Sequence, residues 1–198
     1  PCVFEYIYFS RPDSLIDGVT AYEYRKKLCS ELSKEDDINA DLIVPVPDSG
    51  NAAALGYSQN KNIKFDLGLI RNHYVGRTFI EPAQKIRSLG VKLKLNANKS
   101  SIKNKVIVLV DDSLVRGTTS YKIVNMLYEA GAKEVHLRIA SPEIKFPDFY
   151  GIDMPSKKEL LAANMSVDEI CKYVKAKSLK FLSLNGLYKA MGFEKRNN

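Results

Sequence analysis

Two adjacent acids, Asp111 and Asp112, stand between an apolar run and a turn that is rich in hydroxyl groups. The turn continues in the order Ser113, Leu114, Val115, Arg116, Gly117, Thr118, Thr119, Ser120. Carboxylate oxygens bind sugar hydroxyls or a hard cation such as Mg2+. Backbone N–H groups and hydroxyls at the start of a helix bind anions, and Arg116 adds a positive charge. This stretch therefore predicts a site for a sugar that carries a phosphate group.

A plainer interpretation of the same stretch is a strand–turn–helix unit in which the Asp and Thr residues only cap the helix. An isolated pair of acids or of threonines would favour that alternative. Here the acids, the glycine and the hydroxyls occur in one loop and in a functional order. The binding site is therefore the preferred interpretation.

A second candidate turn, Pro47-Asp48-Ser49-Gly50-Asn51, follows another short apolar run over residues 41–46. Small residues come next and predict the start of a helix, so the turn also offers amide groups to an anion. We expect Asp48, Ser49 and Gly50 to bind a diphosphate group, with the Ser49 hydroxyl near the metal ion. Taken alone, this pattern is weak and is more often a plain turn.

The positive charge of the chain is concentrated in residues 71–105. This segment holds nine Lys or Arg residues and one acid, Glu81, so its net charge is 9 − 1 = +8. The net charge of the whole chain is +7. Gly76, Pro82 and Gly90 interrupt it, and we see no sustained periodicity. We expect a long flexible flap, hinged near Arg71, Tyr74 and Arg77, that closes over a polyphosphate. A solvated charged surface is the alternative.

The elements that must position these residues follow from the apolar patterns. Unbroken or alternating apolar runs predict strands over residues 3–10, 41–46, 65–70, 106–110 and 134–140. The five apolar residues of 106–110 suit a strand buried on both faces of a parallel sheet. Helical spacing predicts helices over residues 21–32 and 120–130, the second ended by Gly131. Between the first helix and the next strand, Glu35–Asp37 reads as a solvated loop.

The last third of the chain has a different character. Ser156 with Glu159 and Ser166 with Glu169 have the spacing of two capping boxes, each predicting a short helix. Residues 179–191 predict either a strand followed by a helix or a helix alone, and 194–198 look frayed. Together the patterns predict one α/β domain over residues 1–198, with a mostly parallel sheet flanked by helices and a C-terminal helical extension.

Composition limits the class of protein. The three cysteines are widely spaced and form no framework, which indicates a reducing, cytoplasmic setting. No apolar segment has the length of a membrane span, and we see no signal peptide, so no membrane partner is expected. The chain begins with Pro1 rather than Met, and we expect it to be a piece of a longer protein.

Six segments carry a closer resemblance to a known family, namely PCVFEYIYFSRPDS, NHYVGRTFI, KLKLNANK, VLVDDSLVRGTTS, ASPEIKFPDFYGIDMPS and the VDEI helix. They resemble the phosphoribosyltransferase half of glutamine phosphoribosyl-diphosphate (PRPP) amidotransferases. The resemblance runs from Pro1 to about Met191 and implies a type I phosphoribosyltransferase fold. It also implies the first committed step of purine synthesis, in which PRPP and ammonia give 5-phosphoribosylamine and diphosphate.

The resemblance also implies residue roles. Ser49, Asp111 and Asp112 match the family's magnesium positions. Asn72, Tyr74 and Arg77 match the flap that closes on PRPP and completes an ammonia passage. Two flap positions depart from the family, which usually has Lys and Arg where this chain has Arg71 and His73. The charge at position 71 is kept, but the geometry of a Lys is not.

Other implied features concern partners and cofactors. The glutaminase half of the family is absent, so Cys2 is not its nucleophile, and ammonia is expected from a separate domain or chain. Cys2 matches an iron–sulfur ligand of cluster-bearing members, but the next ligand position is Asp148, so no iron–sulfur cluster is expected. A homo-oligomer and inhibition by purine nucleotides are further implications. Two alternatives stay open: a PRPP-binding regulatory module whose basic segment contacts nucleic acid, and an inactive fragment.

Overall fold

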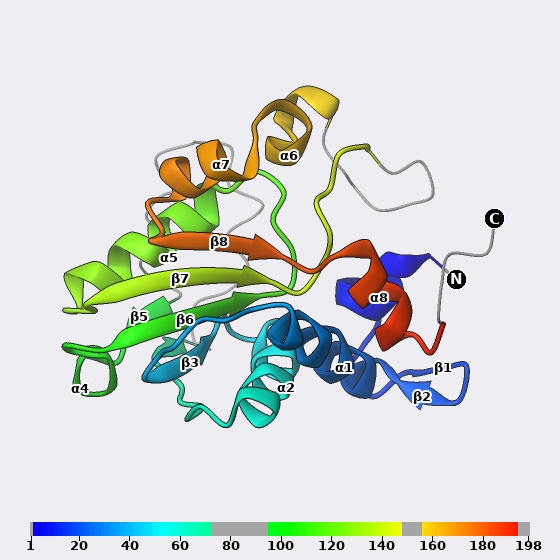
Figure 1. Ribbon diagram of the computed structural model, residues 1–198, viewed down its shortest axis with the longest axis horizontal. Coiled ribbons are helices and arrows are strands. Elements are labelled where there is room, and N and C mark those ends of the chain that lie inside the picture. Colours follow the sequence, from blue (N-terminus) through cyan, green and yellow to red (C-terminus); the bar gives the residue numbers. More distant parts are fainter. Residues whose placement is uncertain (1, 73–94, 148–155, 194–198) are drawn as a thin grey trace.

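A parallel sheet forms the centre of the computed structural model, which describes residues 2–72, 95–147 and 156–193 (Figure 1). Within these ranges the sheet has four strands, in the order β3 (Leu42–Pro45), β6 (Val106–Asp111), β7 (Glu134–Ile139) and β8 (Ser178–Phe181). Every neighbouring pair is parallel. The predicted α/β fold is confirmed, and β3 and β6 end at the same edge because Pro45 pairs with Val110.

Helices cover both faces of the sheet (Figure 1). One face packs against α1 (Ala21–Lys34), α2 (Asn51–Lys61) and α8 (Leu184–Ala190). The other packs against α5 (Thr118–Glu129) and α7 (Val167–Val174), with the short helix α6 (Leu161–Asn164) beside α7. In β6, Val108 and Val110 face the first layer, and Ile107 and Leu109 face the second. The unbroken apolar run was therefore correctly interpreted as a strand buried on both faces.

Among the described residues, two small antiparallel pairs lie outside the main sheet: β1 (Leu15–Ile16) with β2 (Val19–Thr20), and β4 (Leu69–Arg71) with β5 (Leu95–Ala97). The prediction of an irregular flap over 71–105 is wrong at both ends. Arg71 closes β4, and residues 95–102 form β5 and the short helix α4 (Lys99–Ile102). Buried Leu95 and Ile102 anchor these elements in the core. The rest of the expected flap, 73–94, lies outside the described residues.

The expected strand over residues 3–10 is instead helical, and its regular part is the π-helix η1 (Glu5–Phe9). Tyr6 and Ile7 are both buried against α1, with Tyr6 edge-on to Tyr24 at a ring-centroid distance of 4.8 Å. Neighbouring residues of a strand point to opposite faces, so a strand would expose one of these two side chains. Burial of both against one helix outweighs the strand propensity of the aromatic residues.

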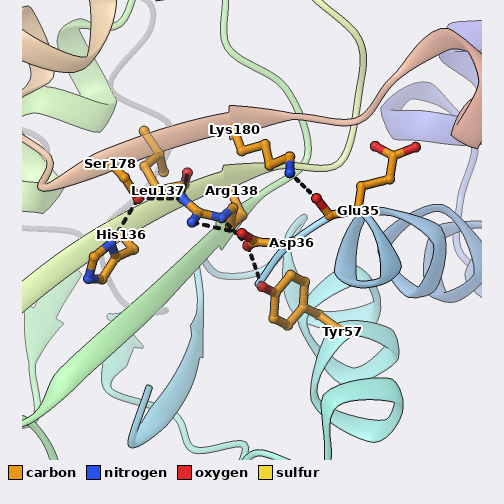
Figure 2. Close-up of polar contacts among 8 residues, drawn as sticks. All are labelled: Glu35, Asp36, Tyr57, His136, Leu137, Arg138, Ser178 and Lys180. Carbon is orange, nitrogen blue, oxygen red and sulfur yellow. Dashed lines mark hydrogen bonds and ion pairs between the residues drawn. The ribbon is translucent and has the colours of Figure 1, made fainter. Parts of the chain in front are cut away.

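The loop at 35–37 is also not the solvated acidic loop that its composition predicts. Asp36 is buried and accepts hydrogen bonds from Arg138 in β7 and, at 2.5 Å, from the hydroxyl of Tyr57 in α2 (Figure 2). Lys180 in β8 donates to the carbonyl of Glu35. The buried charge of Asp36 is thus paired with that of Arg138, as a buried charge requires. These contacts join the end of α1 to the sheet.

The C-terminal segment confirms one of the two predicted capping boxes. Ser166 and Glu169 form both hydrogen bonds of the motif at the start of α7. Ser156 makes no side-chain cap, and the following η3 (Lys157–Glu159) is a single 3₁₀ turn. Its Glu159 is instead paired with Arg116. For residues 179–191, the strand–helix alternative is correct, since β8 joins the sheet before α8 begins.

Candidate active site at the edge of the sheet

The two predicted turns meet beyond the carboxyl ends of β3 and β6. The N–H group of Val46 donates to the carbonyl of Val110 at 2.8 Å, which holds the two chain segments together where the turns begin. Beyond this point the Ser49 hydroxyl donates to Oδ1 of Asp112 over 3.4 Å. Residues that are 63 positions apart in sequence therefore share one end of the sheet. In open parallel sheets, this edge is where ligands bind.

Gly50 is required by the closeness of the two strands. A Cβ atom at this position would lie 2.5 Å from the carbonyl oxygen of Val110 and 2.9 Å from that of Val46. Its N–H group donates to the Val46 carbonyl, and α2 begins at the next residue. The Pro47–Gly50 turn is thus folded tightly against β6, at the N-terminus of an 11-residue helix. Such a helix start favours an anion.

Arg71 joins the base of the basic segment to this turn. Arg71 is the last residue of β4, and its guanidinium group forms an ion pair with Asp48. Both side chains are partly exposed. The next predicted flap residue, Asn72, is half-buried beside it. Tyr74 and Arg77, like His73, lie outside the described residues. The structure therefore brings Arg71, Asp48, Ser49 and Asp112 together by successive contacts.

The paired carboxylates of Asp111 and Asp112 are nearly inaccessible, with exposed fractions of 7% and 6%. Burial raises the pKa of Asp111 well above its ordinary value, and the neighbouring charge of Asp112 raises it further. Burial also raises the pKa of Asp112, although hydrogen bonds and the charge of Arg25 oppose that rise. A pair of buried acids with raised pKa values is typical of a functional site, because folding alone gains nothing from them.

Arg25 is a site residue that the sequence analysis missed. It is 6% exposed in α1 and donates from Nη2 to the Ser10 carbonyl at 2.7 Å and from Nε to the Tyr6 carbonyl at 3.2 Å. Its charge favours the ionised form of Asp112. Its position in the sequence could have predicted its burial. Arg25 lies four residues from both Ala21 and Cys29, inside the buried stripe of the helix.

The state of one carboxylate oxygen of Asp112 indicates whether the residues of this site fit a magnesium ion. Oδ2 of Asp112 is buried and has no hydrogen-bond partner among the described residues. A buried carboxylate oxygen in that state calls for a hydroxyl donor or a cation, and hard cations prefer oxygen ligands. The described residues contain no group of three or more His, Cys, Asp or Glu side chains that could hold a metal ion by themselves. The donor set therefore fits a cation that is held partly by a bound substrate.

The last part of the long turn, from Gly117, lies at the start of α5. Gly117 has a left-handed backbone, with φ of +68°, and its carbonyl accepts from the N–H group of Tyr121 in the first turn of the helix. Thr118 and Thr119 are exposed, whereas Ser120 is buried and Ser113 half-buried. Arg116 is exposed and forms a 3.1 Å ion pair with Glu159. Two exposed threonines thus stand at the start of the helix, while Arg116 is paired with an acid.

Comparisons with known proteins identify relatives that match nearly the whole chain. No protein-family model matches the chain. It is 59% identical over 99% of its length to an amidophosphoribosyltransferase of Rhizobium etli, and 55% identical over 96% of its length to one of Methanocaldococcus jannaschii. It covers 40% and 41% of those proteins.

A solved structure of the glutamine PRPP amidotransferase from Bacillus subtilis, complexed with ADP and GMP, superimposes with a TM-score of 0.89. It is 50% identical over the whole of this chain, which covers 43% of it. The fold is that of a type I phosphoribosyltransferase. More particularly, the chain is homologous over nearly its whole length to amidophosphoribosyltransferases and spans about two fifths of the length of those relatives. Within the described residues, no helix is long and apolar enough to cross a membrane.

Proposed function

We propose that this chain is the PRPP-binding and phosphoribosyl-transferring part of an amidophosphoribosyltransferase. The observation that carries the proposal is the contact between Ser49 and Asp112, which joins the two strand-end turns at one edge of the sheet. The homology of nearly the whole chain to amidophosphoribosyltransferases supports this function over a nucleic-acid-binding module.

Each turn serves one part of the substrate. Asp111 and Asp112 accept hydrogen bonds from the ribose hydroxyls, and the amides and hydroxyls of Gly117–Ser120 hold the 5-phosphate, aided by Ser113 and Arg116. Asp48, Ser49 and Gly50 hold the diphosphate. Ser49, Asp111 and Asp112 are the residues that would hold Mg2+. When bound, the ion would supply positive charge that stabilises the departing diphosphate.

The reaction needs no covalent nucleophile from the protein. The lone pair of ammonia forms a bond to the anomeric carbon, the bond from that carbon to the diphosphate oxygen breaks, and the electron pair leaves with diphosphate. The attacking nitrogen then loses a proton to give the neutral amine. Positioning of the two reactants and stabilisation of the separating charges supply most of the rate enhancement. Arg71, Asn72, Tyr74 and Arg77 would close over the site and exclude water.

Further parts of the proposal rest on the family rather than on this chain. Relatives are more than twice as long, so we propose that a glutaminase domain or chain supplies ammonia in the complete enzyme. Because the Bacillus subtilis protein was solved with ADP and GMP, we propose that purine nucleotides inhibit this one. A homo-oligomer is proposed from the family resemblance alone. A cytoplasmic location is supported by the three free cysteines.

Diphosphate release tests the proposed activity. The purified chain is incubated with PRPP and Mg2+, with ammonium or with glutamine as the nitrogen source. We expect release with ammonium and none with glutamine. The D111N/D112N double variant provides the control, because it keeps side-chain size and removes both charges. Release that is absent from the wild type, or that the double variant retains in full, contradicts the proposal.

A further inference from the structure

Three consecutive residues of the phosphate-binding turn contact one short C-terminal segment. The N–H group of Leu161 donates to the carbonyl of Val115 at 3.0 Å. The guanidinium group of Arg116 pairs with Glu159. At Gly117, an added Cβ atom would lie 2.4 Å from Cδ1 of Leu161. Residues 159–161 thus lie directly behind the turn, on the sheet face that α5, α6 and α7 share (Figure 1).

The contact at Gly117 is the most restrictive of the three. Leu161 leaves no room for a side chain there, and Tyr173 of α7 closes the same space, with Cε1 3.2 Å from the added Cβ position. Two side chains from outside the turn therefore pack against Gly117, whose backbone is left-handed. This backbone determines where the N–H groups that open α5 point.

Leu161 is itself held firmly. Its neighbours Leu160 and Ala162 are buried, with exposed fractions of 0% and 7%, and Leu161 packs against the same core cluster. The side-chain amide of Asn164 donates to the carbonyls of Lys157 at 2.9 Å and Leu160 at 2.7 Å, which closes the segment into a compact unit. A rigid support of this kind reduces the conformational freedom that the turn loses when it binds a ligand.

We propose that Leu161 is a positioning residue for phosphate binding, acting through Val115 and Gly117 without touching the substrate. This inference rests on the proposed function, since it assumes that the turn receives the 5-phosphate of PRPP. In the free protein, Leu161 holds the turn in its binding conformation. Loss of its side chain lets the turn sample other conformations, and the apparent Kd for PRPP rises in inverse proportion to the fraction of time that the turn still spends in the binding conformation.

A comparison of two leucines tests the proposal. Leu161 and Leu179 are both partly buried and pack against the same core cluster, but Leu179 lies in β8 and has no contact of this kind with the turn. In titration calorimetry with PRPP and Mg2+, we expect Leu161→Ala to raise the Kd about tenfold, equal to about 1.4 kcal/mol. Leu179→Ala stays within about twofold of the wild type. Leu161→Met, which keeps the volume, retains wild-type affinity.

Two further readouts separate positioning from a general loss of stability. With ammonium as the second substrate, Leu161→Ala raises the KM for PRPP more than it lowers kcat. Without any substrate, amide hydrogen exchange of residues 115–121 becomes faster in Leu161→Ala and not in Leu179→Ala. If Leu161→Ala does not fold, Leu161→Val provides the milder truncation for the same measurements.

The contact also predicts coupling between its two partners. Gly117→Ala places a methyl group against Leu161, and the double variant G117A/L161A removes that clash. The combined effect on the PRPP Kd is therefore smaller than the product of the single effects. Equal Kd values for all leucine variants, or equal losses in Leu161→Ala and Leu179→Ala, overturn the inference. A wild type that binds no PRPP refutes the proposed function instead, and the exchange comparison then decides whether Leu161 holds the turn.

Discussion

Arg138 donates from Nε and Nη2 to the carboxylate of Asp36, which lies 102 residues earlier in the chain (Figure 2). Both side chains are buried, with Arg138 3% and Asp36 5% exposed. Tyr57 donates to the same carboxylate, and Arg138 also donates to the hydroxyl of Ser178 at 2.9 Å. One ion pair thereby joins the end of α1 to β7, with further bonds to α2 and β8.

Asp36→Asn is expected to destabilise the protein strongly at neutral pH. The substitution keeps the size of the side chain but leaves the buried guanidinium group without a counter-charge. Breaking a buried pair in this way costs about 3–5 kcal/mol in the free energy of unfolding. Urea denaturation measures the loss. Asp37→Asn, at the exposed neighbour, is the matched control and changes the free energy by less than about 0.5 kcal/mol. Similar losses in both variants would contradict the assignment.

The stabilisation from Asp36 also depends on pH. Burial alone would raise the pKa of Asp36, but the hydrogen bonds from Arg138 and Tyr57 outweigh it and hold the pKa below its ordinary value. A lowered acid pKa gives stability that is present above the unfolded-state pKa, about 3.9, and is lost as pH falls through the lower folded-state value. The stability gap between wild type and Asp36→Asn therefore narrows in acid. A gap that stays constant down to about pH 2 would contradict this explanation.

Asp111→Asn is expected to have the opposite effect on stability. Its Oδ1 accepts from the N–H group of Asp112 at 3.0 Å, and an asparagine oxygen can do the same. Burial, and then the charge of Asp112, raises the pKa of Asp111. A raised acid pKa means that the wild type loses stability as pH rises from the unfolded-state pKa to the folded-state one. The variant avoids this loss.

Calorimetric melting across that pH range measures the effect. Asp111→Asn gains about 1 kcal/mol or more over the wild type at neutral pH, and the gain disappears in acid. Its PRPP affinity is expected to fall, because the Asp111 carboxylate that destabilises the free protein is the group that we propose to bind the substrate. The exposed Asp37→Asn variant again serves as the control, with no pH-dependent gain. Lower stability of Asp111→Asn at every pH would show that the buried charge is not a cost to the fold.

Arg25→Met is expected to shift the pH dependence of PRPP binding upward. The Arg25 charge favours the ionised form of Asp112, so its removal raises the pKa of that carboxyl further. A higher pH is then needed to deprotonate Asp112, and the acid pair must be deprotonated to bind a cation. Binding titrations at several pH values measure the shift. Arg11→Met is the control, because Arg11 is exposed and pairs with Asp13 outside the site. An unchanged pH profile in Arg25→Met would contradict the role of Arg25.

The parts of the fold that were predictable are those with a local signal. The run from 106 to 110 and the alternation over 134–140 identified β6 and β7 within about one residue, and the order of acids, glycine and hydroxyls identified the long turn. The failures are long-range. Nothing near Asp36 indicates a partner 102 residues away, so its acidic neighbours made it look solvated. The support of Gly117 by Leu161 is likewise formed only when the chain folds.

Gly50→Ala tests how closely the first turn must approach β6. The added Cβ would meet the carbonyl oxygens of Val110 and Val46, which are backbone atoms and cannot rotate away. The turn must therefore move, at a cost of about 1–3 kcal/mol in unfolding free energy, and the diphosphate contacts that we propose for it would move with it. We expect a clearly higher Kd for PRPP in calorimetric titration. Gly18→Ala is the control: its Cβ meets nothing within 4 Å, and its φ of +81° adds only local strain outside the site. Gly18→Ala thus loses stability but keeps its PRPP affinity, and equal affinities for both variants would contradict the importance of the close approach.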